Sequence, residues 1–248
     1  MFEPIDSIES LESCLTGAEA FRIKHNRPFI TVSYAQSVDG SIATRNRQPI
    51  GLSGPESAIL THRIRACSDS ILIGIGTLLA DDPQLDVRFV EGNSPQPIVL
   101  DTHLRTPLNA RLVKRPDARP WIINAEDKQS RQSLALHDAG SKPICCTASP
   151  DGKIDLHALM KILTENQINS VMVEGGARVI TSFVNSRLVD QFVVTLSPRF
   201  VGGLPVIDSD GLKFETHLEL SEVSYRHAGD DLIIWARPKW GYNIREND

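Results

Sequence analysis

The amino-acid sequence predicts an α/β fold, in which helices flank a mixed, mostly parallel sheet and antiparallel strands follow near the C-terminus. Short β-branched segments alternate with segments of helical periodicity up to about residue 184, the pattern of parallel strands joined by crossover helices. Strand-like segments then follow one another without helices, which indicates an antiparallel edge. We expect one domain over residues 1–248, with an N-terminal helical arm (1–27), a core (28–237) and a polar tail (238–248).

Composition argues against several classes of protein. The chain is 41% hydrophobic and 23% charged with a formal net charge of −5, so it carries no overall basic field for nucleic acid. It contains no apolar run long enough to span a bilayer, and its acidic first residues lack the apolar core of a signal peptide. The four cysteines form no C-x-x-C motif, which favours free thiols in a reducing, cytoplasmic setting. We expect the adjacent Cys145 and Cys146 to be core thiols of a strand.

Each element is predicted from a local pattern: β-branched apolar runs for strands, apolar stripes at helical spacing for helices, and Gly, Asn or Asp for turns. Strands are predicted at residues 29–35, 69–77, 97–100, 121–124, 143–146, 171–173, 190–197, 219–227 and 232–236. Helices are predicted from residue 53 to about residue 67, at 130–139, after Asp155 and from Val179 onward, and a polar loop at 44–51.

The helix that starts near residue 53 has a local start signal. Ser53 is the predicted N-cap, Glu56 would complete a capping box, and Pro55 suits the first turn. The helix carries Arg63 and Arg65, for which a solvated surface position is the default expectation.

The junction Glu174-Gly175-Gly176 is the most informative stretch of the sequence. A buried strand turns there directly into a helix, so the first helical N–H groups and the helix dipole face the junction and can bind a phosphate. Glycine permits close approach of a ligand to the backbone, and Glu174 ends the strand at the same mouth. Because the full dinucleotide fingerprint G-x-G-x-x-G is absent, a plain β-to-α turn remains the alternative from this stretch alone.

A second possible phosphate cradle closes the strand predicted at 69–77. Its sequence Gly74-x-Gly76-Thr77 offers backbone N–H groups and a hydroxyl. Asp81 and Asp82 precede Pro83, which reads as a helix end and turn, although Asp81 could instead hold a ribose hydroxyl.

Taken together, the motifs resemble the pyrimidine reductases of riboflavin biosynthesis over about residues 28–237. The resemblance implies a dihydrofolate-reductase-like fold, commonly as a homodimer. It also implies NADPH-dependent reduction of the ribosylamino group of a pyrimidine 5′-phosphate to a ribitylamino group. The motifs that carry it, in chain order, are Tyr34-Ala-Gln-Ser-Val-Asp-Gly40, Ile73-Gly-Ile-Gly-Thr77, Leu79-Ala-Asp-Asp-Pro83, Arg88, Pro97-Ile-Val-Leu-Asp101 and Val173-Glu-Gly-Gly176.

The same resemblance implies site residues. Arginines suit a sugar phosphate and a carboxylate suits sugar hydroxyls or ring nitrogens. No metal is required, because the hydride comes from the cofactor, and no catalytic proton donor is assigned. The implied substrate residues are Ser33, Arg65, Leu85, Arg88 and Glu174. The implied NADPH residues are Ala35 beside the nicotinamide, and Gly76, Thr77, Asp81, Gly175, Gly176, Ala177, Arg178, Val179, Ile180, Thr181 and Ser182.

Two departures separate the chain from the bifunctional bacterial members of that family. The zinc deaminase motif P-C-x-x-C is absent, so we expect no deamination. Those members tend to have Lys in place of Ser33, and Ser and Trp in place of Pro49 and Gly51. A lysine only donates and suits a ring carbonyl, whereas Ser33 can also accept from an amino group. This favours 2,5-diamino-6-ribosylamino-4(3H)-pyrimidinone 5′-phosphate over 5-amino-6-(5-phosphoribosylamino)uracil as substrate.

Two other functions remain as alternatives on the same fold. One is a dihydrofolate or pterin reductase, which the combination of Arg65, Arg88 and Glu174 disfavours because it suits a phosphorylated substrate. The other is a non-catalytic nucleotide-binding protein, which the two intact cradles disfavour. A preference for NADPH over NADH follows from the family alone, with Lys128 and Arg131 as candidate partners of the 2′-phosphate.

Overall fold

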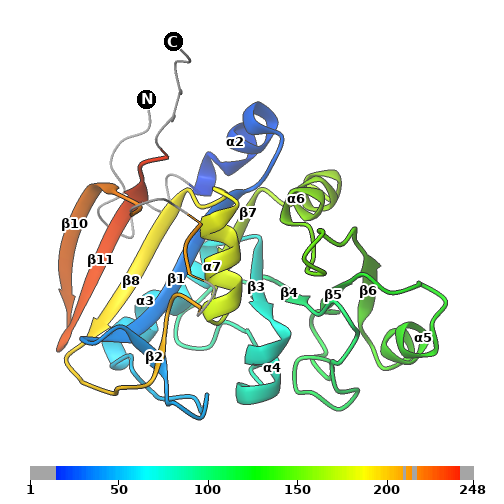
Figure 1. Ribbon diagram of the computed structural model, residues 1–248, viewed down its shortest axis with the longest axis horizontal. Helices are drawn as coiled ribbons and strands as arrows, with labels where there is room; N and C mark the ends of the chain where they lie inside the picture. The colour runs from blue at the N-terminus through cyan, green and yellow to red at the C-terminus, as the bar shows by residue number, and fades with distance from the viewer. Residues whose placement is uncertain (1–14, 209–210, 214–216, 241–248) are drawn as a thin grey trace.

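The computed structural model describes residues 15–208, 211–213 and 217–240 (Figure 1). Its strands are β1 (Phe29–Ser37), β2 (Ser41–Ala43), β3 (Ser70–Gly74), β4 (Gln96–Leu100), β5 (Trp121–Asn124), β6 (Lys142–Cys145), β7 (Ser170–Val173), β8 (Gln191–Ser197), β9 (Leu204–Pro205), β10 (Leu220–Ala228) and β11 (Asp231–Pro238). Its helices are α2 (Ala18–His25), α3 (Pro55–Cys67), α4 (Ile75–Asp81), α5 (Arg131–Asp138), α6 (Leu156–Glu165) and α7 (Ala177–Asn185).

The main sheet has nine strands in the order β10-β11-β8-β1-β7-β3-β4-β5-β6. All neighbours from β8 to β6 pair in parallel, whereas β11 pairs antiparallel with both β8 and β10. The predicted fold class, a mostly parallel sheet with antiparallel C-terminal strands, is therefore confirmed. The sequence did not predict the small second sheet, in which β2 pairs with β9.

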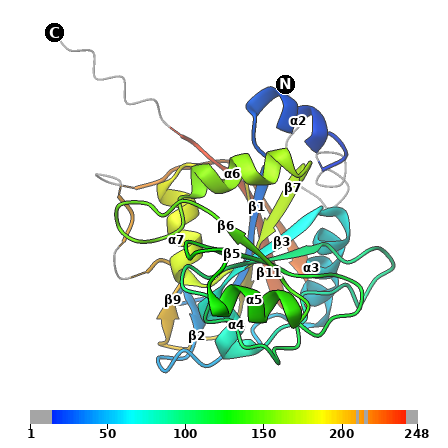
Figure 2. The same ribbon diagram turned by 90° about the vertical axis from the view of Figure 1, so that its right-hand side faces the viewer.

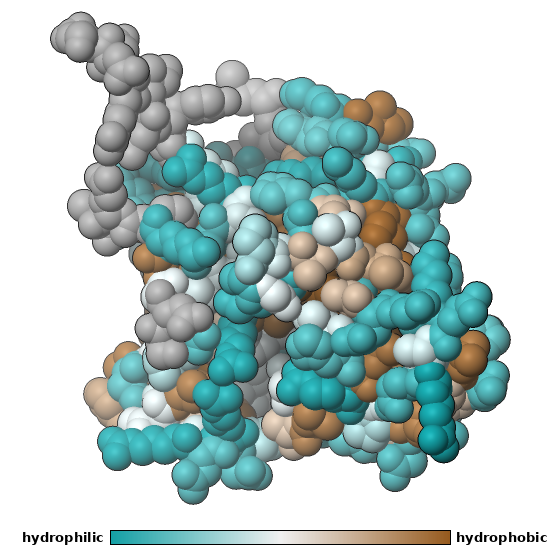
Figure 3. Space-filling view, turned by 45° about the vertical axis from the view of Figure 1, so that its right-hand side comes forward, coloured by the Kyte–Doolittle hydropathy of each residue, from teal (hydrophilic) through white to brown (hydrophobic). Residues whose placement is uncertain are grey.

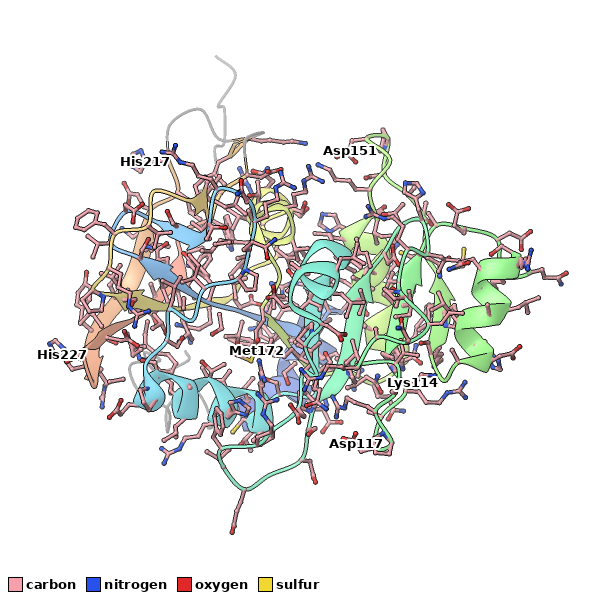
Figure 4. The ribbon with its side chains drawn as sticks, turned by 90° about the horizontal axis from the view of Figure 1, so that it is seen from below. Lys114, Asp117, Asp151, Met172, His217 and His227 are labelled. Atoms are coloured by element: carbon pink, nitrogen blue, oxygen red, sulfur yellow. The ribbon has the colours of Figure 1, made fainter. Side chains whose placement is uncertain are left out.

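Helices cover both faces of this sheet, and the side chains of β7 show how the two cores form. Val171 and Val173 join one apolar cluster with Phe183 of α7, while Met172 joins another with Ile64 of α3. This alternation follows from the two-residue period of a strand. Figure 2 shows α7 and α3 on opposite sides of the sheet, and Met172 lies in the middle of the molecule in Figure 4. A fully buried side chain of this size contributes roughly 1.5–3 kcal/mol to stability.

The start of α3 differs from the prediction. The N-cap is Gly54 and no side chain of the local segment caps it, so the predicted capping by Ser53 is wrong. Instead, Oδ2 of Asp231 accepts the backbone N–H of Gly54 at 2.7 Å and the hydroxyl of Ser57 at 2.6 Å. A carboxylate at a helix N-terminus is favourable for the same reasons as a local cap, but β11 supplies it from far along the chain.

Two further predictions need correction. The strand predicted at 69–77 ends at Gly74, and α4 begins at Ile75, so Gly76 and Thr77 lie in the first turn of a helix. Cys146 is buried and its burial raises its pKa to about 11, but Cys145 is exposed because β6 is an edge strand. The prediction that both thiols lie in the core is therefore wrong for Cys145.

The ends of the chain are described only in part. The predicted N-terminal arm is helical at α2, whereas residues 1–14 and 241–248 lie outside the described residues. Every helix within the described ranges is too short or too polar to cross a bilayer. The face shown in Figure 3 is mainly hydrophilic, with hydrophobic residues in small groups.

Candidate active site

A cavity of about 890 Å³ opens where the parallel strands end. Its wall includes Ala35 of β1, Gly74 at the end of β3, Leu100 at the end of β4 and Glu174 just after β7. Because parallel strands present their carboxyl ends at one edge of a sheet, segments far apart in sequence meet at this position. The two glycine cradles predicted from the sequence therefore belong to one site.

The two cradles are directly connected. The backbone N–H of Gly176 donates to Oγ1 of Thr77 at 3.0 Å, which joins the end of β7 to the first turn of α4. Gly176 is also the N-cap of α7, and no side chain caps that helix. The first-turn N–H groups of α7 therefore lie beside the cavity without a side-chain acceptor, the arrangement that binds phosphate groups in other proteins.

The glycines of the cradles have different physical reasons for lacking a side chain. A Cβ on Gly76 would meet nothing within 4 Å, so a side chain there would project into the cavity. A Cβ on Gly175 would lie 2.8 Å from Cβ of Val179, and one on Gly176 would lie 3.2 Å from Oγ1 of Thr77. Gly175 is therefore required by the packing of α7, whereas Gly76 keeps open the space that a ligand would occupy.

Arg65 of α3 and Glu174 form an ion pair in the cavity wall. Nε and Nη2 of Arg65 donate to the two carboxylate oxygens at 2.7 Å each, and Nη1 donates to the carbonyl oxygen of Asp86 at 3.0 Å. The exposed fractions of the two side chains are only 12% and 15%. Burial lowers the pKa of Arg65, but the adjacent carboxylate raises it overall, so the guanidinium stays charged.

Other polar residues of the wall have little contact with water. Ser33 is 7% exposed and lies beside Tyr34, whose pKa burial raises to about 12, so its phenol is neutral at physiological pH. Burial also raises the pKa of Asp81. Ala35 pairs with Thr195 of β8, and both residues line the cavity. The wall thus combines hydroxyl groups and carboxylates in surroundings that strengthen polar contacts with a ligand.

Not every predicted residue of α7 faces the cavity. Ala177, Arg178, Val179 and Ser182 line it, as do Gly175 and Gly176, but Ile180 and Thr181 do not. Ile180 is buried in the apolar core, and Oγ1 of Thr181 accepts the backbone N–H of Asp208 at 2.9 Å. The 3.6-residue period of the helix turns these two positions away from the ligand side.

Leu85 and Arg88 also lie outside the cavity wall. Leu85 is buried at a φ of 54°, and its carbonyl oxygen accepts a hydrogen bond from the side chain of Arg115. The guanidinium of Arg88 pairs with Asp86, while its backbone N–H donates to Nδ1 of His62 at 3.0 Å. The structure therefore brings Arg65, but not Arg88, to the cavity.

A part of the site that the sequence did not reveal is the wall made by β2 and β9, which contributes Ala43 and Leu204. Asp39 fixes this wall: its carboxylate accepts the backbone N–H groups of Val201 at 2.9 Å and Gly202 at 2.7 Å, as well as two serine hydroxyls. These hydrogen bonds, with the hydroxyl of Ser37 contributing most, hold the pKa of Asp39 well below its usual range.

The sequence also failed to single out the wall residues beyond β3. Thr102, His103 and Arg105 follow β4, and Lys153 follows β6. Their signal was present in the sequence, because each follows a predicted parallel strand at its carboxyl end. Among the described residues, no group of three or more His, Cys, Asp or Glu side chains could hold a metal ion.

Comparisons with known proteins agree with this geometry. Residues 28–234 match the model of the family described as RibD C-terminal domain. The chain is 31% identical over 215 residues to the riboflavin biosynthesis protein RibD of Aquifex aeolicus. The aligned region covers 86% of this chain and 58% of that protein. It therefore spans little more than half of that relative.

Relatives of similar length are also found. The chain is 32% identical over 223 residues to the 2,5-diamino-6-ribosylamino-4(3H)-pyrimidinone 5′-phosphate reductase of Archaeoglobus fulgidus. The aligned region covers 85% of this chain and 98% of that protein. The solved structure of the riboflavin biosynthesis reductase Rib7 of Saccharomyces cerevisiae is 27% identical, with a TM-score of 0.69 and coverage of 92% and 99%.

Proposed function

Because this chain belongs to the RibD C-terminal domain family, we propose that it is an NADPH-dependent reductase of a ribosylaminopyrimidine 5′-phosphate in riboflavin biosynthesis. One observation carries the proposal: a single cavity contains both the glycine cradles and the Arg65–Glu174 pair. The cradles suit a dinucleotide, and the ion pair suits a polar sugar. One cavity thus holds the groups needed to place a cofactor beside a substrate.

The cradle residues fit the pyrophosphate of a dinucleotide. Gly76 leaves open space, and the N-terminus of α7 offers uncapped N–H groups beside Thr77. Ala35 would lie beside the nicotinamide, and Asp81, which also lines the cavity, would accept from a ribose hydroxyl. When bound, the cofactor supplies a hydride, and the protein contributes its orientation and the exclusion of water.

The substrate would lie on the α3 side of the cavity. Ser33 would contact the pyrimidine ring, and Glu174, held in one orientation by Arg65, would accept from the hydroxyl groups of the sugar. In the ring-opened form of the substrate, C1′ is double-bonded to the amino nitrogen. Hydride addition to C1′ and a proton on nitrogen give the ribitylamino product.

We also propose that the chain forms a homodimer through the open edge of the sheet. β10 is an edge strand, and it exposes Leu220, Val223 and Tyr225 by 41%, 40% and 64%. A long edge strand with exposed apolar side chains is a template for pairing with a second chain. Light scattering should report a dimer for the parent and a monomer after Tyr225→Lys, and a monomeric parent would refute this point.

The experiment that tests the proposed function is an NADPH oxidation assay with each candidate pyrimidine and with dihydrofolate. We expect NADPH absorbance to fall only with a ribosylaminopyrimidine 5′-phosphate, and faster with the 2,5-diamino compound. Activity on dihydrofolate would favour the folate or pterin reductase, and binding of NADPH without turnover of any substrate would favour a non-catalytic nucleotide-binding protein.

A further inference from the structure

The cavity has an end that the two glycine cradles do not occupy. The strands of its wall are ordered β8, β1, β7, β3 and β4 along the sheet, so β1 and β4 are three strand spacings apart. At about 4.8 Å per spacing, this is about 14 Å. A dinucleotide with its nicotinamide at Ala35 and its pyrophosphate between β7 and β3 would extend its adenosine to the end of β4.

This far end has an apolar floor and a polar rim. Leu100, Ile154, Leu156 and Val179 belong to one apolar cluster, and all four also line the cavity. Apolar walls suit a purine ring. The residues of the rim are Thr102, His103, Arg105 and Lys153.

The carboxylate of Asp101, which directly follows β4, is withdrawn from the cavity. Asp101 is completely buried, and its Oδ2 accepts the backbone N–H and the hydroxyl of Thr106 at 2.7 and 2.8 Å. Nε of Arg105 lies 3.8 Å from Oδ1 of Asp101, and the Arg105 side chain is 57% exposed. In dinucleotide sites, an exposed carboxylate after the second strand binds the ribose 2′-hydroxyl, whereas an arginine there accommodates a 2′-phosphate. At this site the carboxylate of Asp101 is buried and the exposed side chain is that of Arg105.

The other titratable side chains of the rim, Lys153 and His103, each have a carboxylate partner. Nζ of Lys153 lies 3.4 Å from Oδ2 of Asp151, a residue that projects from a loop at the rim of the molecule in Figure 4. Glu126 lies 3.1 Å from Nδ1 of His103, and it is not part of the cavity wall. Arg105 and Lys153 are the arginine and the lysine of this rim, and Arg105 also lies beside the buried carboxylate of Asp101.

We infer that Arg105, assisted by Lys153, binds the 2′-phosphate of the cofactor and sets the preference for NADPH over NADH. The inference rests on the proposed function, because it assumes that the cavity binds a pyridine dinucleotide. This inference gives Arg105 the role for which Lys128 and Arg131 were the candidates from the sequence, because neither of those residues lies in the wall of the cavity. The planar guanidinium of Arg105 can bind two phosphate oxygens at once, whereas Lys153 acts as a point charge.

The test is calorimetric titration of the purified full chain with two adenosine fragments, 2′,5′-ADP and 5′-AMP. We expect the parent to bind 2′,5′-ADP about ten- to a hundredfold more tightly than 5′-AMP, the effect of a charge-assisted contact. Arg105→Ala and Arg105→Gln should remove most of this difference and leave 5′-AMP binding unchanged. Lys153→Ala should reduce the difference in affinity between the two fragments by a smaller factor. Lys128→Ala and Arg131→Ala are matched controls that should leave it intact.

The outcomes separate this inference from the proposed function. If the Arg105 variants lost affinity for both fragments equally, with unchanged thermal unfolding, the role of Arg105 would be overturned. The proposed dinucleotide site would remain in place. The role of Arg105 would also be overturned if only Lys128→Ala or Arg131→Ala reduced the preference of the protein for 2′,5′-ADP over 5′-AMP. A folded parent that binds neither fragment nor NADPH would overturn the proposed function and this inference together.

Discussion

Arg65 of α3 and Glu174 at the end of β7 are joined by two hydrogen bonds of 2.7 Å, although they lie 109 positions apart in the chain. Such a two-bonded pair fixes both the position and the plane of the carboxylate. The third bond of Arg65, to the carbonyl oxygen of Asp86, also fixes the guanidinium. Most of the donors of Arg65 are therefore committed to the protein, and we expect Arg65 to act on the substrate mainly by positioning Glu174.

The first prediction concerns stability. Arg65→Ala leaves Glu174 unpaired in a nearly buried position, and should lower the free energy of unfolding by about 1–3 kcal/mol. Arg65→Lys should recover only part of this loss, because an ammonium lacks the planar fork. A double-mutant cycle with Glu174→Gln measures the coupling, which should exceed about 0.5 kcal/mol. Arg88→Ala is the control: its side chain is 46% exposed, and the change should stay within about 0.5 kcal/mol.

The same variants distinguish positioning from recognition of the phosphate. Arg65→Ala should lower kcat/KM by about ten- to a hundredfold on both the phosphorylated and the dephosphorylated pyrimidine. A loss confined to the phosphorylated substrate would contradict positioning and support direct contact with the phosphate, as the sequence resemblance implies. Arg88→Ala should have little effect on either substrate, because Arg88 lies outside the cavity wall.

The second prediction uses the different roles of the glycines. Gly76→Val should weaken NADPH binding by at least about tenfold without loss of thermal stability, because its side chain enters open cavity space. Gly175→Ala is the contrasting variant: its Cβ would lie 2.8 Å from Val179, so it should destabilise the fold. Fluorescence titration and thermal unfolding measure the two effects. Unchanged NADPH affinity in Gly76→Val would place the pyrophosphate elsewhere.

The order of elements was largely readable from the sequence because its signals are local. β-branched runs such as that of β7 and the cap of α6 at Asp155 were read correctly, since the responsible residues adjoin the element. The start of α3 cannot be predicted from the local sequence, because the carboxylate that caps it belongs to Asp231, 177 positions away. α4 was not separated from the preceding strand, because Gly76 and the β-branched Ile75 and Thr77 are weak helix formers.

The site could be predicted only at the residues that the family resemblance implies. Gly76, Thr77, Arg65 and Glu174 lie in the cavity wall as the resemblance implies, but their mutual contacts depend on the order of strands. Position in a motif did not reveal that Arg88 lies outside the wall. That distinction requires the three-dimensional path of the loop after α4.

The third prediction concerns the choice of substrate. Ser33 is 7% exposed in the cavity wall, and its hydroxyl can accept from a ring amino group. The parent should therefore have a higher kcat/KM for the 2,5-diamino pyrimidine than for the uracil counterpart, and Ser33→Lys should reduce or reverse that ratio. Ser33→Ala controls for loss of the hydroxyl alone. A parent preference for the uracil compound would refute the role assigned to Ser33.

The fourth prediction concerns pH. Burial, followed by the charges of Arg65 and Arg88, holds the pKa of His62 below its ordinary value of 6.5, and its Nδ1 accepts the backbone N–H of Arg88. Because the folded state binds this proton less readily than the unfolded state, the contribution of His62 to stability is complete above 6.5. It is lost as the pH falls through the folded value.

The measurement compares the parent with His62→Asn, whose amide oxygen can still accept a hydrogen bond. Between about pH 7.5 and about pH 5.5, the parent should lose more unfolding free energy than the variant, by up to about 1.4 kcal/mol per pH unit. Parallel stability curves would show that His62 is not responsible.

The central claim is that the cavity brings a nicotinamide next to C1′ of a ring-opened ribosylaminopyrimidine phosphate. Its most direct test is a single-turnover reaction with NADPH that carries deuterium on the transferred position of its nicotinamide, followed by mass spectrometry of the pyrimidine product. The account predicts a ribitylamino product with one deuterium, located at C1′, formed by the parent and strongly reduced in Gly76→Val. Oxidation of the cofactor without deuterium in the pyrimidine product, or deuterium at any other carbon, would contradict it.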